Sequence, residues 1–245
     1  MSESTSRRPR KVEAALGTRL PERYAAGWFE QFEAQFRPVF KPGLRILDVG
    51  SGRKPALALE QRPEGCFYVG LDVSQRELEL APEGSYDETF CSDIAVRIPA
   101  LSSRFDLIIS WQVLEHVAPL DAVLEHLRIY LRPGGRMVAL LSGGLSAFGV
   151  VNRVVPSRLG VWALEHLTGR DPDTVFPAHY DRCYYTALNG MLKPWSTAEV
   201  LPFFRGASYF RFSRIPQGAY LRYENWAARS GRRNLATHYL LVAER

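Results

Sequence analysis

The chain lacks any apolar run of about 18 residues, so an ordinary membrane-spanning helix is not expected. No apolar segment follows the polar, basic opening S-E-S-T-S-R-R-P-R-K, which therefore predicts a frayed tail rather than a signal peptide. Cysteine is scarce, and Cys66, Cys91 and Cys183 form no C-x-x-C pair. Such an odd, sparse set is typical of a reducing cytoplasm, and we expect all three to be small buried side chains.

The composition is that of an ordinary soluble protein, with 46% hydrophobic and 23% charged residues over a length of 245. This length suits one large α/β domain with additions. The net charge of +5 is concentrated in the tail and in the arginines from residue 205 onward. Solvated arginines that maintain solubility explain the excess, and an anionic acceptor or surface is the alternative.

Short β-like runs alternate with polar or helical segments through the first part of the chain. A helix is predicted at 120–131, ended by Arg132-Pro133-Gly134-Gly135. The predicted strands are Arg45 to Val49, Cys66 to Asp72, Glu88 to Cys91, Phe105 to Ser110 and Gly135 to Leu141. This alternation predicts an α/β fold with a doubly wound, mostly parallel sheet. Before it, apolar residues at helical spacing over 19–40 predict an amphipathic helical cap.

The pattern changes after Ser142. Residues 143–195 are rich in aromatics, Pro, Gly and His and are expected to form a substrate-lid insertion. We predict a short helix over Ser196 to Phe204, because Ser196 and Glu199 have capping-box spacing. Ala207 to Ile215 and Leu235 to Ala243 are predicted as two late strands. The chain would thus divide into an N-terminal tail and cap, 1–43, and one domain, 44–245, that contains the lid.

The segment L-R-I-L-D-V-G-S-G, residues 44–52, predicts a buried strand that ends in a tight, ligand-binding turn. Gly50 and Gly52 allow the backbone to approach a bound molecule closely. Asp72, twenty positions after Gly52, suits a carboxylate that accepts hydrogen bonds from ribose hydroxyls. Pro55 breaks the dinucleotide fingerprint G-x-G-x-x-G, and the phosphate-binding pattern G-x-x-x-x-G-K-[ST] is absent.

With these motifs the chain resembles the class I S-adenosylmethionine-dependent methyltransferases, within them the type-11 group of small-molecule enzymes. The matching pieces, in order, are D-V-G-S-G at 48–52, G-L-D-V-S at 70–74, the acid Asp93, F-D-L-I-I-S-W-Q-V-L-E-H-V at 105–117, and L-R-P-G-G-R-M-V at 131–138. The resemblance implies a Rossmann-like seven-stranded sheet with a C-terminal antiparallel hairpin. It also implies S-adenosyl-L-methionine as cofactor.

Transferred position by position, the resemblance implies a set of cofactor contacts. Asp48 would lie near the ammonium group, Asp72 would hold the ribose, and Asp93 would accept from the adenine amino group. The full set is Asp48, Gly50, Gly52, Asp72, Val73, Asp93, Ile94, Ser110, Trp111 and Gln112. Capping roles for the three acids are the alternative.

A general base is needed only when the acceptor must lose a proton early. His116 follows the fourth predicted strand and is one candidate, although a structural role for Glu115 and His116 is as good an explanation. His179 is the other candidate, in the segment where Tyr180, Tyr184 and Tyr185 would contact a substrate or pack the lid's own core. No His, Cys or carboxylate cluster has metal-ligand spacing.

The sequence therefore predicts a cytoplasmic methyltransferase acting on a small molecule, most simply on a hydroxyl of a glycan, lipid or secondary metabolite. The alternatives are N- or C-methylation of a small molecule, a non-catalytic cofactor-binding or partner-binding module, and methylation of RNA or protein. Nucleic-acid amine methylation loses support because Ser110-Trp111-Gln112-Val113 replaces the Asn/Asp-Pro-Pro-aromatic tetrad. The stretch Phe148 to Leu167 is apolar enough for a peripheral membrane contact, although a buried lid helix is the simpler explanation. The protein would be a monomer or a homodimer.

Overall fold

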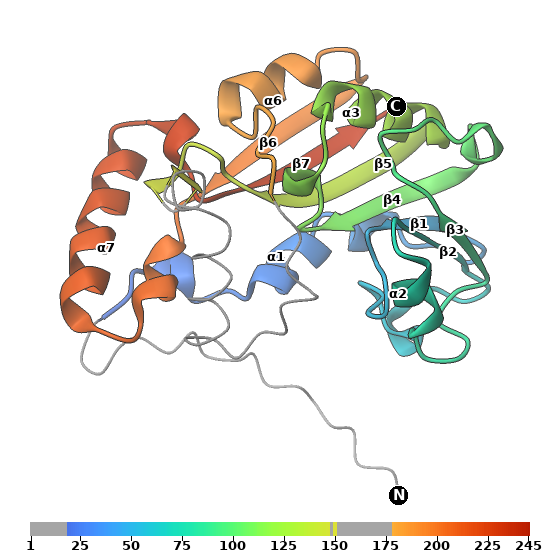
Figure 1. Cartoon of the computed structure of the whole chain (residues 1–245), viewed down its shortest axis with the longest axis horizontal. Helices are drawn as coiled ribbons and strands as arrows, with labels where there is room; N and C mark the ends of the chain where they lie inside the picture. Colours follow the sequence, from blue (N-terminus) through green and yellow to red (C-terminus); the bar gives the residue numbers. More distant parts are fainter. Residues whose placement is uncertain (1–18, 148, 151–177) are drawn as a thin grey trace, which may run out of the picture.

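The computed structural model describes residues 19–147, 149–150 and 178–245 (Figure 1). Their framework is one seven-stranded sheet in the order β3-β2-β1-β4-β5-β7-β6. The strands are β1 Arg45–Val49, β2 Phe67–Asp72, β3 Glu88–Cys91, β4 Phe105–Trp111, β5 Leu131–Ser142, β6 Thr197–Phe203 and β7 His238–Glu244. The sheet confirms the expected Rossmann-like fold, since β1 to β5 pair in parallel and β7 is antiparallel to both β5 and β6.

The helices α3, Leu120–Tyr130, and α6, Tyr185–Met191, cover one face of the sheet, and α1, Trp28–Glu33, packs on the other. Side chains of β1 alternate between these layers: Leu47 belongs to the α3 side and Ile46 to the α1 side. The remaining α-helices are α2 Gln75–Glu79 and α7 Arg214–Arg229; short 3-10 turns are η1 Glu22–Tyr24, η2 Arg37–Val39, η3 Leu59–Gln61, η4 Pro99–Leu101, η5 Leu114–His116, η7 Gly206–Phe210 and η8 Arg233–Leu235.

The topology brings several strand ends to one edge of the sheet. Val49, Asp72, Trp111 and Ser142 end four parallel strands, and the strand order reverses between β1 and β4, where open α/β sheets bind ligands. His238, the first residue of β7, pairs with Ser142 and therefore lies at this edge too.

Two predictions for the late chain are wrong. Thr197–Phe203 is not a helix but the strand β6, which pairs with β7 at the end of the described sheet. The capping-box spacing of Ser196 and Glu199 imitates a helix start, whereas an edge strand tolerates Pro202, which has no N–H to donate. The predicted strand 207–215 is instead η7 and the start of α7. Ala207 and Phe210 pack beside Tyr220 of α7 rather than in a sheet, and Phe212 and Ile215 face solvent.

The three cysteines are free thiols, but only Cys183 is buried; Cys66 is half-buried and Cys91 exposed, so that expectation was wrong for two of them. Within the described ranges, no helix is both long and apolar enough to cross a bilayer. The tail 1–18 and most of the expected lid lie outside the described residues, and only residues 149–150 of the stretch 148–167 are described.

Candidate functional site

The glycine turn after β1 has the backbone conformation that its sequence predicts. Gly50 and Gly52 have φ of 71° and 47°, a region that favours glycine. A Cβ on Gly50 would lie 2.2 Å from Cγ2 of Val113, so the loop after β4 packs directly on this turn. Tyr86 donates from its hydroxyl to the Gly52 carbonyl at 2.7 Å and fixes the turn from the β3 side.

Asp48, at the end of β1, holds the loop that follows the same turn through hydrogen bonds. Its side chain is 1% exposed, and Oδ2 accepts hydrogen bonds from the Tyr68 hydroxyl at 2.6 Å and the Ala56 N–H at 2.7 Å. Burial raises the pKa of Asp48 to about 6, against these two hydrogen bonds. Its observed partners are protein groups that shape the loop, and the cofactor-ammonium role stays a prediction.

Asp72 ends β2 beside the glycine turn. Its Oδ1 accepts from the Ser74 N–H at 2.8 Å, and its Oδ2 lies 3.3 Å from the position that a Cβ on Gly52 would occupy. Any side chain at 52 would therefore crowd this carboxylate. Burial raises the pKa of Asp72, with the neighbouring backbone N–H groups opposing the shift. Next to it, Val73 is 61% exposed, an apolar surface at the ligand-binding edge.

The loop after β3 holds the next predicted residues in different ways. Asp93 is exposed, and its Oδ1 accepts from the Ala95 N–H at 2.8 Å. Ile94 is 5% exposed and packs in the core under α3, where its carbonyl accepts a hydrogen bond from Nδ1 of His126 at 3.0 Å. Asp93 therefore lies toward solvent at this edge, and the side chain of Ile94 lies in the core.

The three residues predicted at the end of β4 point in different directions. Ser110 is fully buried, and its hydroxyl donates to the Val49 carbonyl at 3.4 Å. The ring of Trp111 packs against Phe32 and Phe29 of α1, with centroids 5.1 and 5.4 Å away. Gln112 is exposed and has a φ of 56°, a strained conformation for a residue with a Cβ. Trp111 thus joins the N-terminal cap to the site.

Glu115 ties three segments together beside His116. Its Oε1 accepts from the Ser142 N–H at 3.1 Å, and its carbonyl accepts from the Tyr180 N–H at 2.9 Å. The other carboxylate oxygen, Oε2, is buried and has no hydrogen-bond partner among the described residues. Burial raises the pKa of Glu115, and the adjacent His116 opposes this shift. The sequence hinted at this residue only through the Glu-His pair.

The predicted lid residues separate into surface and core. His179 is exposed, whereas Tyr180 is 7% exposed and packs in the main core. Tyr184 precedes α6 and is half-buried. Tyr185 packs partly against the main core, and its hydroxyl accepts a hydrogen bond from Arg233 at 2.6 Å. Core packing thus accounts for most of this aromatic segment.

Sequence reasoning missed an aromatic and cationic cluster at the β7 end of the same edge. The Trp28 ring lies 4.4 Å from the His238 ring and 4.3 Å from the Arg205 guanidinium carbon, which lies over it. Burial lowers the pKa of His238 to about 4, so the ring is neutral at pH 7. These residues come from distant parts of the chain, and no local motif marks their meeting.

These residues fit S-adenosyl-L-methionine. The half-buried Asp72 carboxylate beside a side-chain-free turn suits ribose hydroxyls, and exposed Val73 suits the apolar face of adenine. In the part of the chain that the structure describes, no group of three or more His, Cys, Asp or Glu residues is placed to hold a metal ion.

Comparison with known proteins places the chain in a family. A family model described as a methyltransferase domain matches residues 19–175, more than half of the chain. A ubiquinone biosynthesis O-methyltransferase from a Chelativorans species is 34% identical over 114 residues, which cover 44% of each chain. The chain therefore aligns with less than half the length of such curated relatives.

Solved structures share the fold. A SAM-dependent methyltransferase from Archaeoglobus fulgidus has a TM-score of 0.53 at 20% identity, over 89% of this chain and 95% of that one. Phosphoethanolamine N-methyltransferase 2 from Haemonchus contortus, solved with S-adenosyl-L-methionine, has a TM-score of 0.54 at 14% identity, over 89% and 53%. The chain belongs to the methyltransferase-domain family, and its sheet has the fold of the class I S-adenosylmethionine-dependent methyltransferases.

Proposed function

We propose that this enzyme transfers the methyl group to a hydroxyl of a small molecule: a glycan, a lipid or a secondary-metabolite intermediate. The observation that carries the proposal is the edge where Asp72 lies beside Gly52 and Val113 of the β4 loop lies beside Gly50. Glu115 and His116 belong to η5, the turn that follows Val113. The O-methyltransferase names of its curated relatives support a hydroxyl as acceptor.

The bound cofactor supplies an electrophilic methyl group, so the protein's task is alignment and removal of a proton. A bond forms between the acceptor oxygen and the methyl carbon as the sulfur–methyl bond breaks, and the hydroxyl proton goes to a base. We assign that base to His116, because Glu115 holds this segment against β5 and the segment of Tyr180. The neighbouring turn, closed by Val113, positions the methyl donor.

The test is incubation with methyl-labelled cofactor and a panel of phenols, catechols, sugars and amines, read by mass spectrometry. Label on oxygen of at least one hydroxyl acceptor supports the proposal. Label found only on nitrogen or carbon would replace O-methylation by the corresponding reaction. Tight cofactor binding with no transfer to any acceptor would instead indicate a binding module.

His116→Ala identifies the base within the same assay. We expect its kcat to fall by about a hundredfold, as is typical for loss of a general base, with cofactor affinity unchanged. His179→Ala is the matched control, since that side chain is exposed in the lid segment. Equal activity of the two variants would remove His116 from the proton-transfer role.

A further inference from the structure

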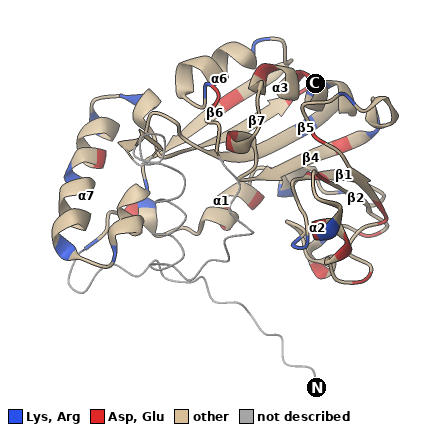
Figure 2. Cartoon of the chain, in the orientation of Figure 1, with Lys and Arg blue, Asp and Glu red and all other residues tan. Residues whose placement is uncertain are grey.

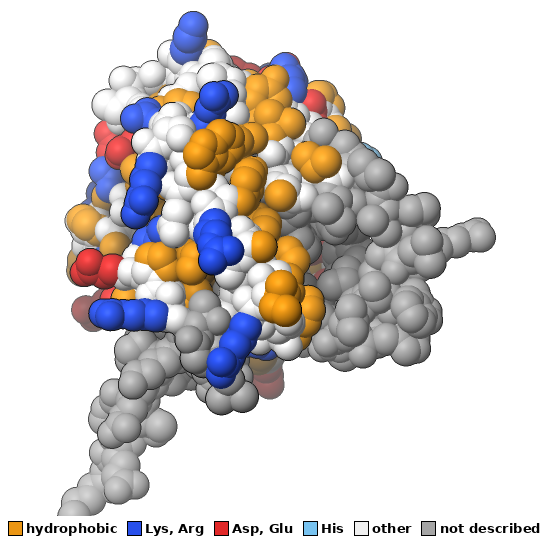
Figure 3. Space-filling model, turned by 90° about the vertical axis from the view of Figure 1, so that its left-hand side faces the viewer, with side chains coloured by type: hydrophobic (Ala, Val, Ile, Leu, Met, Phe, Trp, Pro, Cys, Tyr) orange, Lys and Arg blue, Asp and Glu red, His pale blue; other side chains and the backbone are white. Residues whose placement is uncertain are grey.

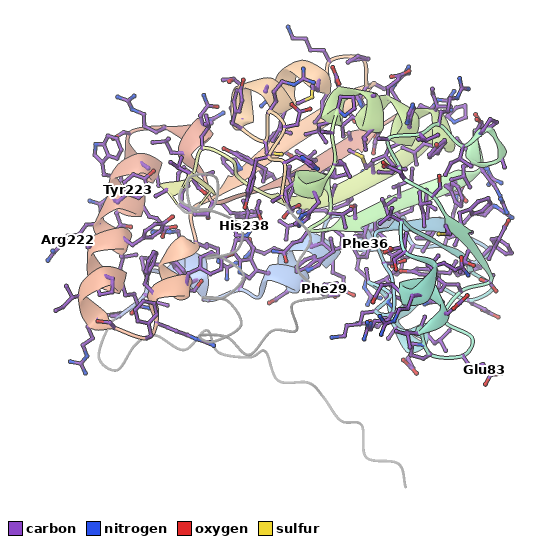
Figure 4. The ribbon with its side chains drawn as sticks, in the orientation of Figure 1. Phe29, Phe36, Glu83, Arg222, Tyr223 and His238 are labelled. Carbon is purple, nitrogen blue, oxygen red and sulfur yellow. The ribbon has the colours of Figure 1, made fainter. Side chains whose placement is uncertain are left out.

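Helix α7 lies at one end of the sheet and buries only one of its faces (Figure 1). Gln217, Tyr220, Glu224 and Ala227 make up the inner face. At 100° per residue, Ile215, Arg222, Trp226 and Arg229 fall together on the opposite side, and each is exposed. Arg222 points away from the body of the protein (Figure 4).

The outer side of this helix carries unusually exposed apolar groups. Ile215 is 85% exposed, Phe212 in the preceding turn 78%, and Trp226 50%. Including Tyr209, four of the nine large apolar side chains exposed among the described residues lie between 209 and 226. Figure 3 shows apolar and basic side chains interleaved over this end of the molecule. Single exposed apolar residues are ordinary, but such a concentration marks a contact surface.

The charge on the same surface has one sign. From residue 205 to 235 the only acidic residue is Glu224, which is 1% exposed. Its carboxylate accepts hydrogen bonds from the Tyr24 hydroxyl and the Gly206 N–H and lies 3.6 Å from Arg23. These interior partners bind the carboxylate, so it does not add negative charge to the surface. The exposed charges are all arginines: Arg211, Arg214, Arg222, Arg229, Arg232 and Arg233 (Figure 2).

We propose that the α7 face, made up of Phe212, Arg214, Ile215, Arg222, Trp226 and Arg229, docks the protein onto an anionic lipid surface. Phe212 and Ile215 would enter the boundary between headgroups and acyl chains, where Trp226 also partitions well. The long arginine side chains would reach the phosphates around them. The contact would be peripheral, with α7 parallel to the membrane.

Other occupants fit this face less well. A two-fold contact between the α7 faces of two copies would bring arginine against arginine, because residues 205–235 contain no exposed acid to neutralise them. Single-stranded RNA would stack on Phe212 and Trp226 but would leave Ile215, the most exposed of these side chains, without an aromatic face to stack on. An anionic bilayer accommodates the arginines, the aromatic rings and the aliphatic Ile215 together.

The test is co-sedimentation of the full chain with phosphatidylcholine vesicles that contain about 30 mol% phosphatidylglycerol. We expect binding that weakens strongly as salt rises from about 0.05 to 0.5 M and is weak on phosphatidylcholine alone. The Phe212→Ser/Ile215→Ser variant should bind at least about tenfold more weakly. Leu59→Ser/Leu80→Ser is the matched control, since these side chains are 54% and 50% exposed elsewhere, and it should bind normally.

A charge-matched pair separates the arginines of the face from basicity in general. Arg222→Gln/Arg229→Gln should weaken binding by about tenfold, whereas Arg76→Gln/Arg97→Gln should have a small effect. Circular dichroism and cofactor binding confirm that each variant is folded. Equal binding by the α7-face and control variants would overturn the proposal. The proposal would also be overturned if the protein did not bind vesicles but bound a uridine oligonucleotide through the α7 face, or if that face mediated dimerisation in sedimentation velocity.

Discussion

The Tyr68 hydroxyl donates a hydrogen bond to Oδ2 of Asp48 at 2.6 Å inside the sheet, and the same hydroxyl accepts the Leu57 N–H at 3.2 Å. One side chain of β2 thus secures both the acid before the glycine turn and the loop after it. Because both partners are buried, the site's shape depends on this pair.

Tyr68→Phe tests that relationship. The variant leaves the Leu57 N–H without its acceptor and Asp48 with one fewer donor, so we expect a loss of about 1–3 kcal/mol in unfolding free energy. Chemical denaturation measures it. Tyr130→Phe, which removes a hydroxyl bonded to the Ile98 N–H away from the turn, is the control for cofactor affinity: only Tyr68→Phe should weaken it.

Asp48 should make the protein less stable as pH rises. Its folded pKa of about 6 lies above the unfolded value near 4, so the native state holds the proton longer and stability falls between these values. Asp48→Asn removes this penalty, on the order of 3 kcal/mol at pH 7. Relative to wild type, the variant should gain stability between pH 4 and 7 in urea titrations. A constant difference across that range would mean that Asp48 does not titrate as described.

His238 should make the protein less stable as pH falls. Its folded pKa of about 4 lies below the ordinary value of 6.5, so its contribution is present above pH 6.5 and is lost as pH falls toward 4. His238→Phe keeps a ring against Trp28 but cannot be protonated. The unfolding free energy of the wild type minus that of this variant should therefore fall by an amount on the order of 3 kcal/mol from pH 7 to pH 4. A difference that stays constant or rises in acid would contradict the buried, neutral ring.

Gly50→Ala should damage the turn by more than backbone strain. Gly134→Ala is the matched control, because Gly134 has a similar φ of 75° with open space around it and should cost about 1 kcal/mol. At Gly50 the new methyl group would also meet Val113. We expect a loss of several kcal/mol, partly recovered when Val113→Ala is added. Equal losses at both glycines would show that Val113 does not close the turn.

The sequence predicted the parts of the fold whose signals are local. The bounds of β1 and β3 match, because each is a short run bounded by turns, and α3 ends one residue before its prediction. Strand β6 could not be predicted in this way. Its Ser196 and Glu199 imitate a helix cap, and only pairing with β7 makes the segment extended.

The candidate site likewise contains residues with local sequence signals and residues that meet only in the folded chain. Strand-to-turn transitions are visible in the sequence and predicted Asp72, Gly50 and Gly52 as site residues, and the parallel sheet places these three together; their contacts with the cofactor stay a prediction. The contact of Val113 with Gly50 and the Trp28–His238–Arg205 cluster depend on chain segments that meet only after folding. No local pattern announces such contacts.

Calorimetric titration with S-adenosyl-L-methionine, comparing the wild type with Asp72→Ala, tests most directly whether the edge around the glycine turn is the cofactor site. We expect the wild type to bind one equivalent and the variant to bind at least about tenfold more weakly, because the carboxylate's charge-assisted hydrogen bonds are lost. Glu79→Ala, an exposed carboxylate on the nearby helix α2, should leave the affinity unchanged. Wild type that does not bind at high micromolar cofactor, or an Asp72→Ala variant of unchanged affinity, would contradict the account.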